Sequence, residues 1–154
     1  MEHANCIEAK TISEALLART GDAILSGDFE TFAQCFSLPH FIATADCKTT
    51  LRTRTELRAV FDRVHEDYRR KRVTDLVRQC DVAEYRSQTR IEATHTTHMM
   101  SGPHRLMDPF PAFSVLELTD GAWRCAQSQY ALDEQTTVGR ALQVTFEQSK
   151  NQNN

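Results

Sequence analysis

The stretch TISEALLARTGDAILSGDFETFAQCFSLPHFIATADCKTTLRTRTELRAVFDRVHEDYRRKR, residues 11–72, decides the fold. Two short helical patterns open it, a strand-like segment follows over residues 41–46, and a third, longer helical pattern closes it. Helices gathered before a run of strands indicate an α+β architecture. The stretch contains no motif that indicates a particular reaction.

End signals predict the first two helices. Thr11-Ile12-Ser13-Glu14 matches a capping box, in which side-chain oxygens accept hydrogen bonds from free N–H groups at a helix start. It predicts a helix over about residues 12–25. Gly27 suits the left-handed residue that ends this helix, and Asp28 suits the N-cap of a second helix over about residues 29–36.

A hairpin and a third helix are expected next. Pro39 lacks an N–H group, so the second helix should stop before it. Residues 40–46 and 49–53 are β-branched and partly alternating, which is typical of paired strands. A second capping box, Thr53-Arg54-Thr55-Glu56, then predicts a long helix. Its apolar residues recur at helical spacing and should be buried: Leu57, Val60, Phe61, Val64 and Tyr68.

From residue 73 onward the hydrophobic period changes from that of a helix to that of a strand. Four long strands are predicted, over residues 74–85, 89–100, 106–118 and 123–132. Asp120-Gly121 supplies the positive φ angles of a tight turn between the last two. Residues 136–148 predict a C-terminal helix. We expect one domain over residues 1–154, with its core at about 11–132 and flexible tails at 1–10 and 149–154.

Composition argues against several functional classes. The 154 residues are 40% apolar and 25% charged, which is typical of a soluble globular domain. A net charge of −3 gives no general attraction to nucleic acid or anionic lipid. The start of the chain lacks the features of a signal peptide, so we expect a cytoplasmic protein. The five cysteines include no C-x-x-C pair, which indicates free thiols.

Half of the basic residues lie between Lys48 and Arg72. Acidic residues alternate with them at i,i+4 distances, namely Glu56, Asp62, Glu66 and Asp67. Such spacing predicts a salt-bridged face exposed to solvent. We therefore expect no nucleic-acid partner.

Several of these features together resemble the nuclear transport factor 2-like superfamily: the Gly27-Asp28-Phe29 turn, the passage from helix to strand over 36–46, the capped third helix and the long closing strands. Members include SnoaL-like polyketide cyclases, ketosteroid isomerases and many bacterial proteins. The resemblance covers about residues 11–132. It implies a cone-shaped, strongly curved, mostly antiparallel sheet wrapped around the N-terminal helices. It also implies a pocket inside the cone and a homodimer formed through the sheet.

The resemblance gives mixed support for catalysis. Ketosteroid isomerases use a tyrosine on the first helix, an aspartate base after the first strand and a second acid on a late strand. Aligned by the Gly27-Asp28 turn, Asp46 stands near the base and Thr20 stands near the tyrosine. Because a threonine hydroxyl cannot stabilise an oxyanion as a phenolic hydroxyl does, we do not expect isomerisation by the same mechanism. Asp46 stays a candidate catalytic residue, or a turn residue that bonds its own backbone.

His95 and His98 invite a metal interpretation. Residues three apart on a strand point to opposite faces, so these two side chains should not share an ion. By alternation, Ile91, Ala93, His95, Thr97 and Met99 share the more apolar face. His95 is therefore the pocket candidate, either as a catalytic base or as a core histidine bonded to a hydroxyl, and no metal site is expected.

Five residues are predicted to contact a ligand inside the cone: Phe41, Phe61, His95, Phe110 and Tyr130. The two prolines of Met107-Asp108-Pro109-Phe110-Pro111-Ala112-Phe113 imply a bulge, an edge or an irregular stretch. Such a break can shape the mouth of a pocket. It can equally be a plain bend that lets the sheet curve.

Two functions from different classes fit this pattern. The first is binding of a small, largely apolar or aromatic molecule, with Asp46 or His95 as general base if the molecule is turned over. We expect this function to need no metal and no nucleotide cofactor. The second is a non-catalytic protein-interaction or dimerisation module with a filled cone. It would use residues 110–113 and the stripe Val138, Leu142 and Phe146. A cavity on the order of several hundred Å³ that His95 faces would favour the first.

Overall fold

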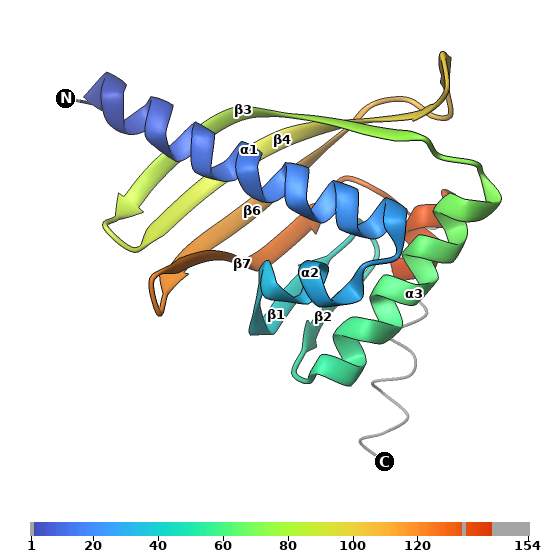
Figure 1. Ribbon diagram of the computed structural model, residues 1–154, viewed down its shortest axis with the longest axis horizontal. Helices are drawn as coiled ribbons and strands as arrows, with labels where there is room; N and C mark the ends of the chain where they lie inside the picture. The colour runs from blue at the N-terminus through green and yellow to red at the C-terminus, as the bar shows by residue number, and fades with distance from the viewer. Residues whose placement is uncertain (1, 134, 143–154) are drawn as a thin grey trace.

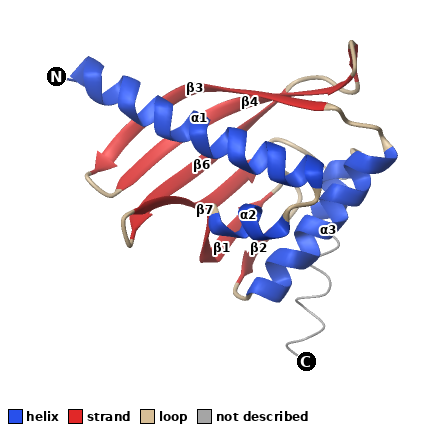
Figure 2. Cartoon of the chain, viewed as in Figure 1, coloured by secondary structure: helices blue, strands red, loops and turns tan. Residues whose placement is uncertain are grey.

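The computed structural model describes residues 2–133 and 135–142. Its helices are α1 (Glu2–Ser26), α2 (Phe29–Gln34) and α3 (Arg54–Arg70). Its strands are β1 (Phe36–Ala43), β2 (Lys48–Leu51), β3 (Asp75–Ser87), β4 (Arg90–Ser101), β5 (His104–Arg105), β6 (Phe110–Thr119) and β7 (Ala122–Tyr130). Figures 1 and 2 show the helices gathered on one face of a single curved sheet.

The sheet has the strand order β2-β1-β7-β6-β4-β3, with β5 paired to β4. Every neighbouring pair is antiparallel except β1 and β7, which are parallel. Along β4 the buried residues Ile91, Ala93, His95, Thr97 and Met99 alternate with half-buried ones. This arrangement confirms the α+β class, with a mostly antiparallel sheet wrapped around the N-terminal helices. It also confirms which face of β4 points inward.

The first helix is longer than its sequence signals indicate. α1 begins at Glu2, ten residues before the predicted start. The hydroxyl of Thr11 donates to the carbonyl oxygen of Ile7 at 2.9 Å, so the proposed capping box lies in the helix interior. The added turns are supported from the β3–β4 hairpin: Ala9 is fully buried, and the Tyr85 hydroxyl donates to Glu8. The predicted flexible tail is therefore helical over residues 2–10, while residues 149–154 lie outside the described part.

The passage from α2 to β1 also differs from the prediction. Asp28 is the N-cap of α2 and accepts a hydrogen bond from the Thr31 N–H at 3.1 Å, as expected. However, α2 ends at Gln34 and β1 begins at Phe36, so Pro39 lies inside the strand. The pairing of β1 with β7 is interrupted between Phe36 and Phe41. A proline fits such an interruption because no ladder hydrogen bond is required of it there.

α3 follows its sequence signals closely. Thr53 is the N-cap and its hydroxyl accepts from the Glu56 N–H at 3.2 Å. The five predicted apolar residues are the buried ones on this helix. Its charged face carries the ion pairs Arg58–Asp62, Arg69–Glu66, Arg70–Glu66 and Lys71–Asp67. The predicted salt-bridged face is therefore confirmed.

The closing strands match their predictions with one change. The strand expected from residue 106 begins at Phe110, and the short β5 precedes it. The proline-broken stretch is thus irregular up to Pro109, with Pro111 paired to Thr96 inside the sheet. Asp120 and Gly121 both have positive φ angles, 52° and 77°, which confirms the tight turn.

Residues 137–142 are helical, and the rest of the predicted C-terminal helix lies outside the described residues. Val138 and Leu142, on this helical turn, pack into the main core beside α3. Among the described helices, none is both long and apolar enough to cross a membrane.

Candidate functional site

A cavity of about 100 Å³ lies inside the cone, between the sheet and the helices. Its walls are mainly apolar and come from α1, α2, α3, the sheet and the C-terminal helical turn. Three of the predicted ligand contacts, Phe61, Phe110 and Tyr130, line it. Val138 and Leu142 line it as well. The C-terminal turn therefore helps to cover the apolar space inside the cone.

Polar side chains reach this apolar cavity from several elements. They are Thr20, His40, Tyr68, Arg78, Thr97 and Tyr130. Polar groups this few among apolar walls are typical of a site that orients a small molecule.

Arg78 enters the cone from β3 and contacts α1. Its Nη2 donates to the carbonyl oxygen of Leu17 and, at 2.7 Å, to the hydroxyl of Thr20. Its Nε is buried and has no hydrogen-bond partner within residues 2–133 and 135–142. Burial lowers the pKa of the guanidinium, while the negative charge of Asp22 acts in the opposite direction. In that same part of the chain, no carboxylate forms an ion pair with Arg78.

A second, smaller cavity of about 40 Å³ adjoins the first. Thr20, Phe36, Arg78 and Tyr130 line both cavities, so these side chains form the boundary between them. His95 lines only the smaller one. Its side chain is 4% exposed, and its Nε2 is buried without a partner among the described residues. Burial and the nearby Arg78 charge lower the pKa of His95 to about 4, so the imidazole is neutral at pH 7.

His40 is held more firmly than His95. Its Nδ1 lies 3.1 Å from the carbonyl oxygen of Cys125, and its Nε2 lies 3.1 Å from the Ser128 hydroxyl. The residue is 2% exposed, and burial lowers its pKa to about 4. Both ring nitrogens are therefore engaged within the protein. His95 differs from His40 in that it lines a cavity with one ring nitrogen that has no partner among the described residues.

Two tyrosines complete the polar lining. Burial raises the pKa of Tyr68 well above its usual range and also raises the pKa of Tyr130. Both phenols are therefore protonated at neutral pH. They offer hydroxyl groups to the cavity but no negative charge to balance Arg78.

Residues 14–132 match the model of the SnoaL-like domain family. This match covers more than half of the chain. The chain belongs to the SnoaL-like domain family.

Several solved structures share the fold of this SnoaL-like domain. A nuclear transport factor 2-like protein of unknown function from Shewanella oneidensis has a TM-score of 0.63 and 11% identity, covering 79% of this chain and 98% of its own. One from Novosphingobium aromaticivorans, described with a cystatin-like fold, has a TM-score of 0.60 and 18% identity, covering 88% and 89%. A domain of unknown function from Nostoc punctiforme has a TM-score of 0.61 and 15% identity, covering 96% and 98%. No curated protein matches.

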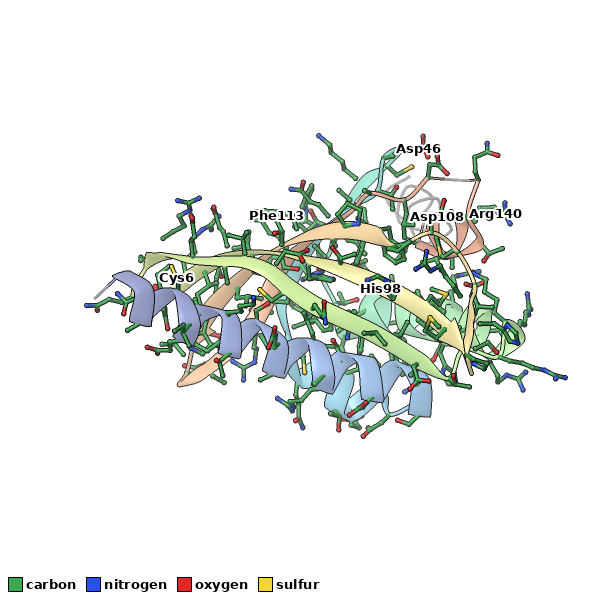
Figure 3. All side chains as sticks on the ribbon, turned by 90° about the horizontal axis from the view of Figure 1, so that it is seen from above. Cys6, Asp46, His98, Asp108, Phe113 and Arg140 are labelled. Carbon is green, nitrogen blue, oxygen red and sulfur yellow. The ribbon has the colours of Figure 1, made fainter. Side chains whose placement is uncertain are left out.

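The SnoaL-like domain does not bring all the predicted residues together. Asp46 is exposed in the turn between β1 and β2, outside the residues that line either cone cavity. Phe41 lies on the outer face of β1, because its neighbours His40 and Ile42 point inward and alternation turns it away. His98 and Phe113 also lie on the side of the sheet away from α1, as Figure 3 shows. His95 and His98 thus point to opposite faces, as predicted.

The sequence reasoning missed Arg78, the central polar residue of this site. Two signals could have found it. Leu76, Arg78 and Cys80 alternate with the exposed Val77 on β3, so an arginine occupies the inward-facing position. Gly21 is the second signal, because a glycine inside a long helix often marks a close approach by another group.

Proposed function

We propose that this SnoaL-like domain binds a small, largely apolar molecule inside the cone. The observation that carries the proposal is the largely apolar cavity inside the cone, which the polar residues Arg78, Thr20 and Tyr130 also line. A volume of about 100 Å³ is smaller than the several hundred Å³ expected from the sequence. Together with the adjoining cavity of about 40 Å³, this space approaches the roughly 150 Å³ of a dry apolar cavity known to hold benzene, so it suits a molecule with a single ring.

If the molecule is turned over, His95 is the better candidate for a general base. It is buried and neutral, and its side chain lines the smaller cavity, whereas Asp46 is exposed outside both. The proposed step is proton abstraction or ring closure next to a carbonyl group. His95→Ala should then abolish turnover while leaving binding in the larger cavity measurable. Asp46→Asn should leave turnover unchanged, and the opposite pattern would assign the base to Asp46.

The binding proposal is tested by mass spectrometry on gently purified protein. Native and denaturing spectra of the same sample would reveal a retained small molecule as a mass difference between the two. Val64 lines the cavity from α3, so Val64→Phe should fill the space and remove the retained molecule. A retained molecule that persists in a folded Val64→Phe variant would place binding elsewhere. A matched Thr55→Phe control, on the exposed face of the same helix, should retain it.

The rival proposal, a protein-interaction module, loses part of its support. Val138 and Leu142 are buried in the core and line the cavity, so they are not available to a partner. Phe146 lies outside the described residues. Phe110 is also buried, while Phe113 lines a shallow groove on the outer face together with Phe41. The homodimer through the sheet therefore stays a prediction, with these two phenylalanines as its apolar contacts.

A further inference from the structure

Two buried nitrogen atoms without a partner belong to side chains that line the same small cavity. They are Nε of Arg78 and Nε2 of His95, and neither has a hydrogen-bond acceptor or donor opposite it among the described residues. Both side chains line the smaller cavity, and Arg78 lines the larger one too. Buried polar atoms in folded proteins are nearly always bonded. Two exceptions at one cavity indicate a place where a ligand supplies the missing atoms.

The charge at this place is positive and not balanced nearby. Arginine stays protonated in proteins. The carboxylates that act on this pair from a distance are Asp22, which is exposed on α1, and Asp81, which is exposed on β3. The tyrosines beside Arg78 are protonated and neutral. An anionic group in the cavity would therefore be the direct counter-charge of Arg78.

The guanidinium is also fixed in place before any ligand arrives. Its Nη2 is engaged by the Leu17 carbonyl and the Thr20 hydroxyl, so the side chain cannot swing out of the cone without losing both bonds. A purely structural role, tying β3 to α1, explains these two bonds. It does not explain why Nε has no partner among the described residues. Nor does it explain why His95, whose Nε2 also lacks a partner there, lines the same cavity.

We infer that the ligand is a small organic acid, whose carboxylate accepts hydrogen bonds from Nε of Arg78 and from Nε2–H of His95. Its apolar ring lies in the larger cavity, against Phe61 and Phe110. This inference rests on the proposed function and adds the chemical class of the ligand. It assigns Arg78 as the residue that selects for an acid, because a charge-assisted hydrogen bond is about twice as strong as a neutral one.

Benzoate and benzamide provide the test, since they share a ring and a planar head group and differ in charge. Both are titrated into the protein at pH 7 and followed by NMR, with the ¹⁵N–¹H signal of Arg78 Nε as the direct reporter. We expect benzoate to bind about tenfold or more tightly than benzamide. We also expect its addition to shift the Arg78 Nε signal. Arg78→Met should reduce the preference to near one, whereas the control Arg86→Met, exposed on the same strand, should preserve it.

Different results would overturn the proposed binding function and the inference that the ligand is an acid. Equal binding of the two probes to the wild-type protein would overturn the acid inference and leave the apolar binding function standing. Failure of both probes to bind at millimolar concentration would overturn both. A benzoate preference that survives in folded Arg78→Met would also overturn the role of Arg78. If Arg78→Met does not fold, the wild-type comparison and the Nε signal decide the matter without it.

Discussion

The guanidinium of Arg78 lies directly against the backbone of Gly21. A Cβ atom at Gly21 would lie 2.9 Å from Nη2 of Arg78, closer than two such atoms can approach. Nη2 is held there by the Leu17 carbonyl and the Thr20 hydroxyl on the same helix. A glycine inside a helix costs about 1 kcal/mol relative to alanine. α1 carries this cost at the point where the arginine of β3 crosses it.

Gly21→Ala should displace the Arg78 side chain. The variant gains helix propensity of about 1 kcal/mol but loses two hydrogen bonds from a charged group, worth about 1.5–3 kcal/mol each, so its free energy of unfolding should fall. The displaced guanidinium should weaken benzoate binding. Urea unfolding and the NMR titration measure the two effects separately.

The same substitution in an Arg78→Met background is the matched control. Without a guanidinium to displace, alanine at position 21 should stabilise the protein by about 1 kcal/mol. A coupling energy near zero between positions 21 and 78 would show that the Arg78 guanidinium does not require a glycine at position 21.

Stability should fall as the pH is lowered from 7 to 5. Burial lowers the pKa of His40 and of His95 to about 4, from 6.5 in the unfolded chain. Between these values the unfolded chain binds more protons, so the stabilisation is fully present above pH 6.5 and is lost toward pH 4. The slope approaches about 1.4 kcal/mol per pH unit for each histidine. Urea unfolding at several pH values measures it, and His95→Gln should reduce it by about half.

A flat profile between pH 7 and pH 5 would contradict the neutral, buried state of both histidines. His40→Gln should also reduce the slope by about half, because burial lowers the pKa of His40 to about 4.

Thr53→Ala should destabilise the protein by about 1 kcal/mol. The hydroxyl of Thr53 accepts the Glu56 N–H at the start of α3, and alanine leaves that group without its partner. Thermal or urea unfolding measures the loss. Thr55→Ala, on the exposed surface of the same helix turn, should be nearly neutral, and equal effects at both positions would argue against capping.

Light scattering should show a dimer that Phe113→Glu converts to a monomer. The substitution places a charge beside Phe41 in the outer groove, where an apolar contact with a second copy is predicted. Thr55→Glu, remote from the sheet, should leave the dimer intact. A monomeric wild-type protein at micromolar concentration would contradict the predicted assembly.

Local signals in the sequence determined much of the fold. The Thr53 capping box, the Asp120-Gly121 turn and the alternation along β4 each act within a few residues. Their structural outcome depends little on the rest of the chain. That alternation also placed His95 inside the cone and His98 outside it. The helix start predicted from the Thr11 capping box was wrong. The residues before Thr11 also form helix, and the β3–β4 hairpin contacts this added part of α1.

The residues that form the site could be identified only from the tertiary structure. Arg78 and Thr20 are 58 residues apart in the chain, and the bond between them exists because α1 packs across β3. Phe41 faces outward because His40 and Ile42 point into the cone, and which face of β1 points inward was decided by its packing against the rest of the molecule. Capping, turns and alternation depend on neighbours in sequence, so the sequence alone determined them. Cavity volume, buried charge and unpartnered nitrogens depend on groups brought together from distant segments, and only packing decided those.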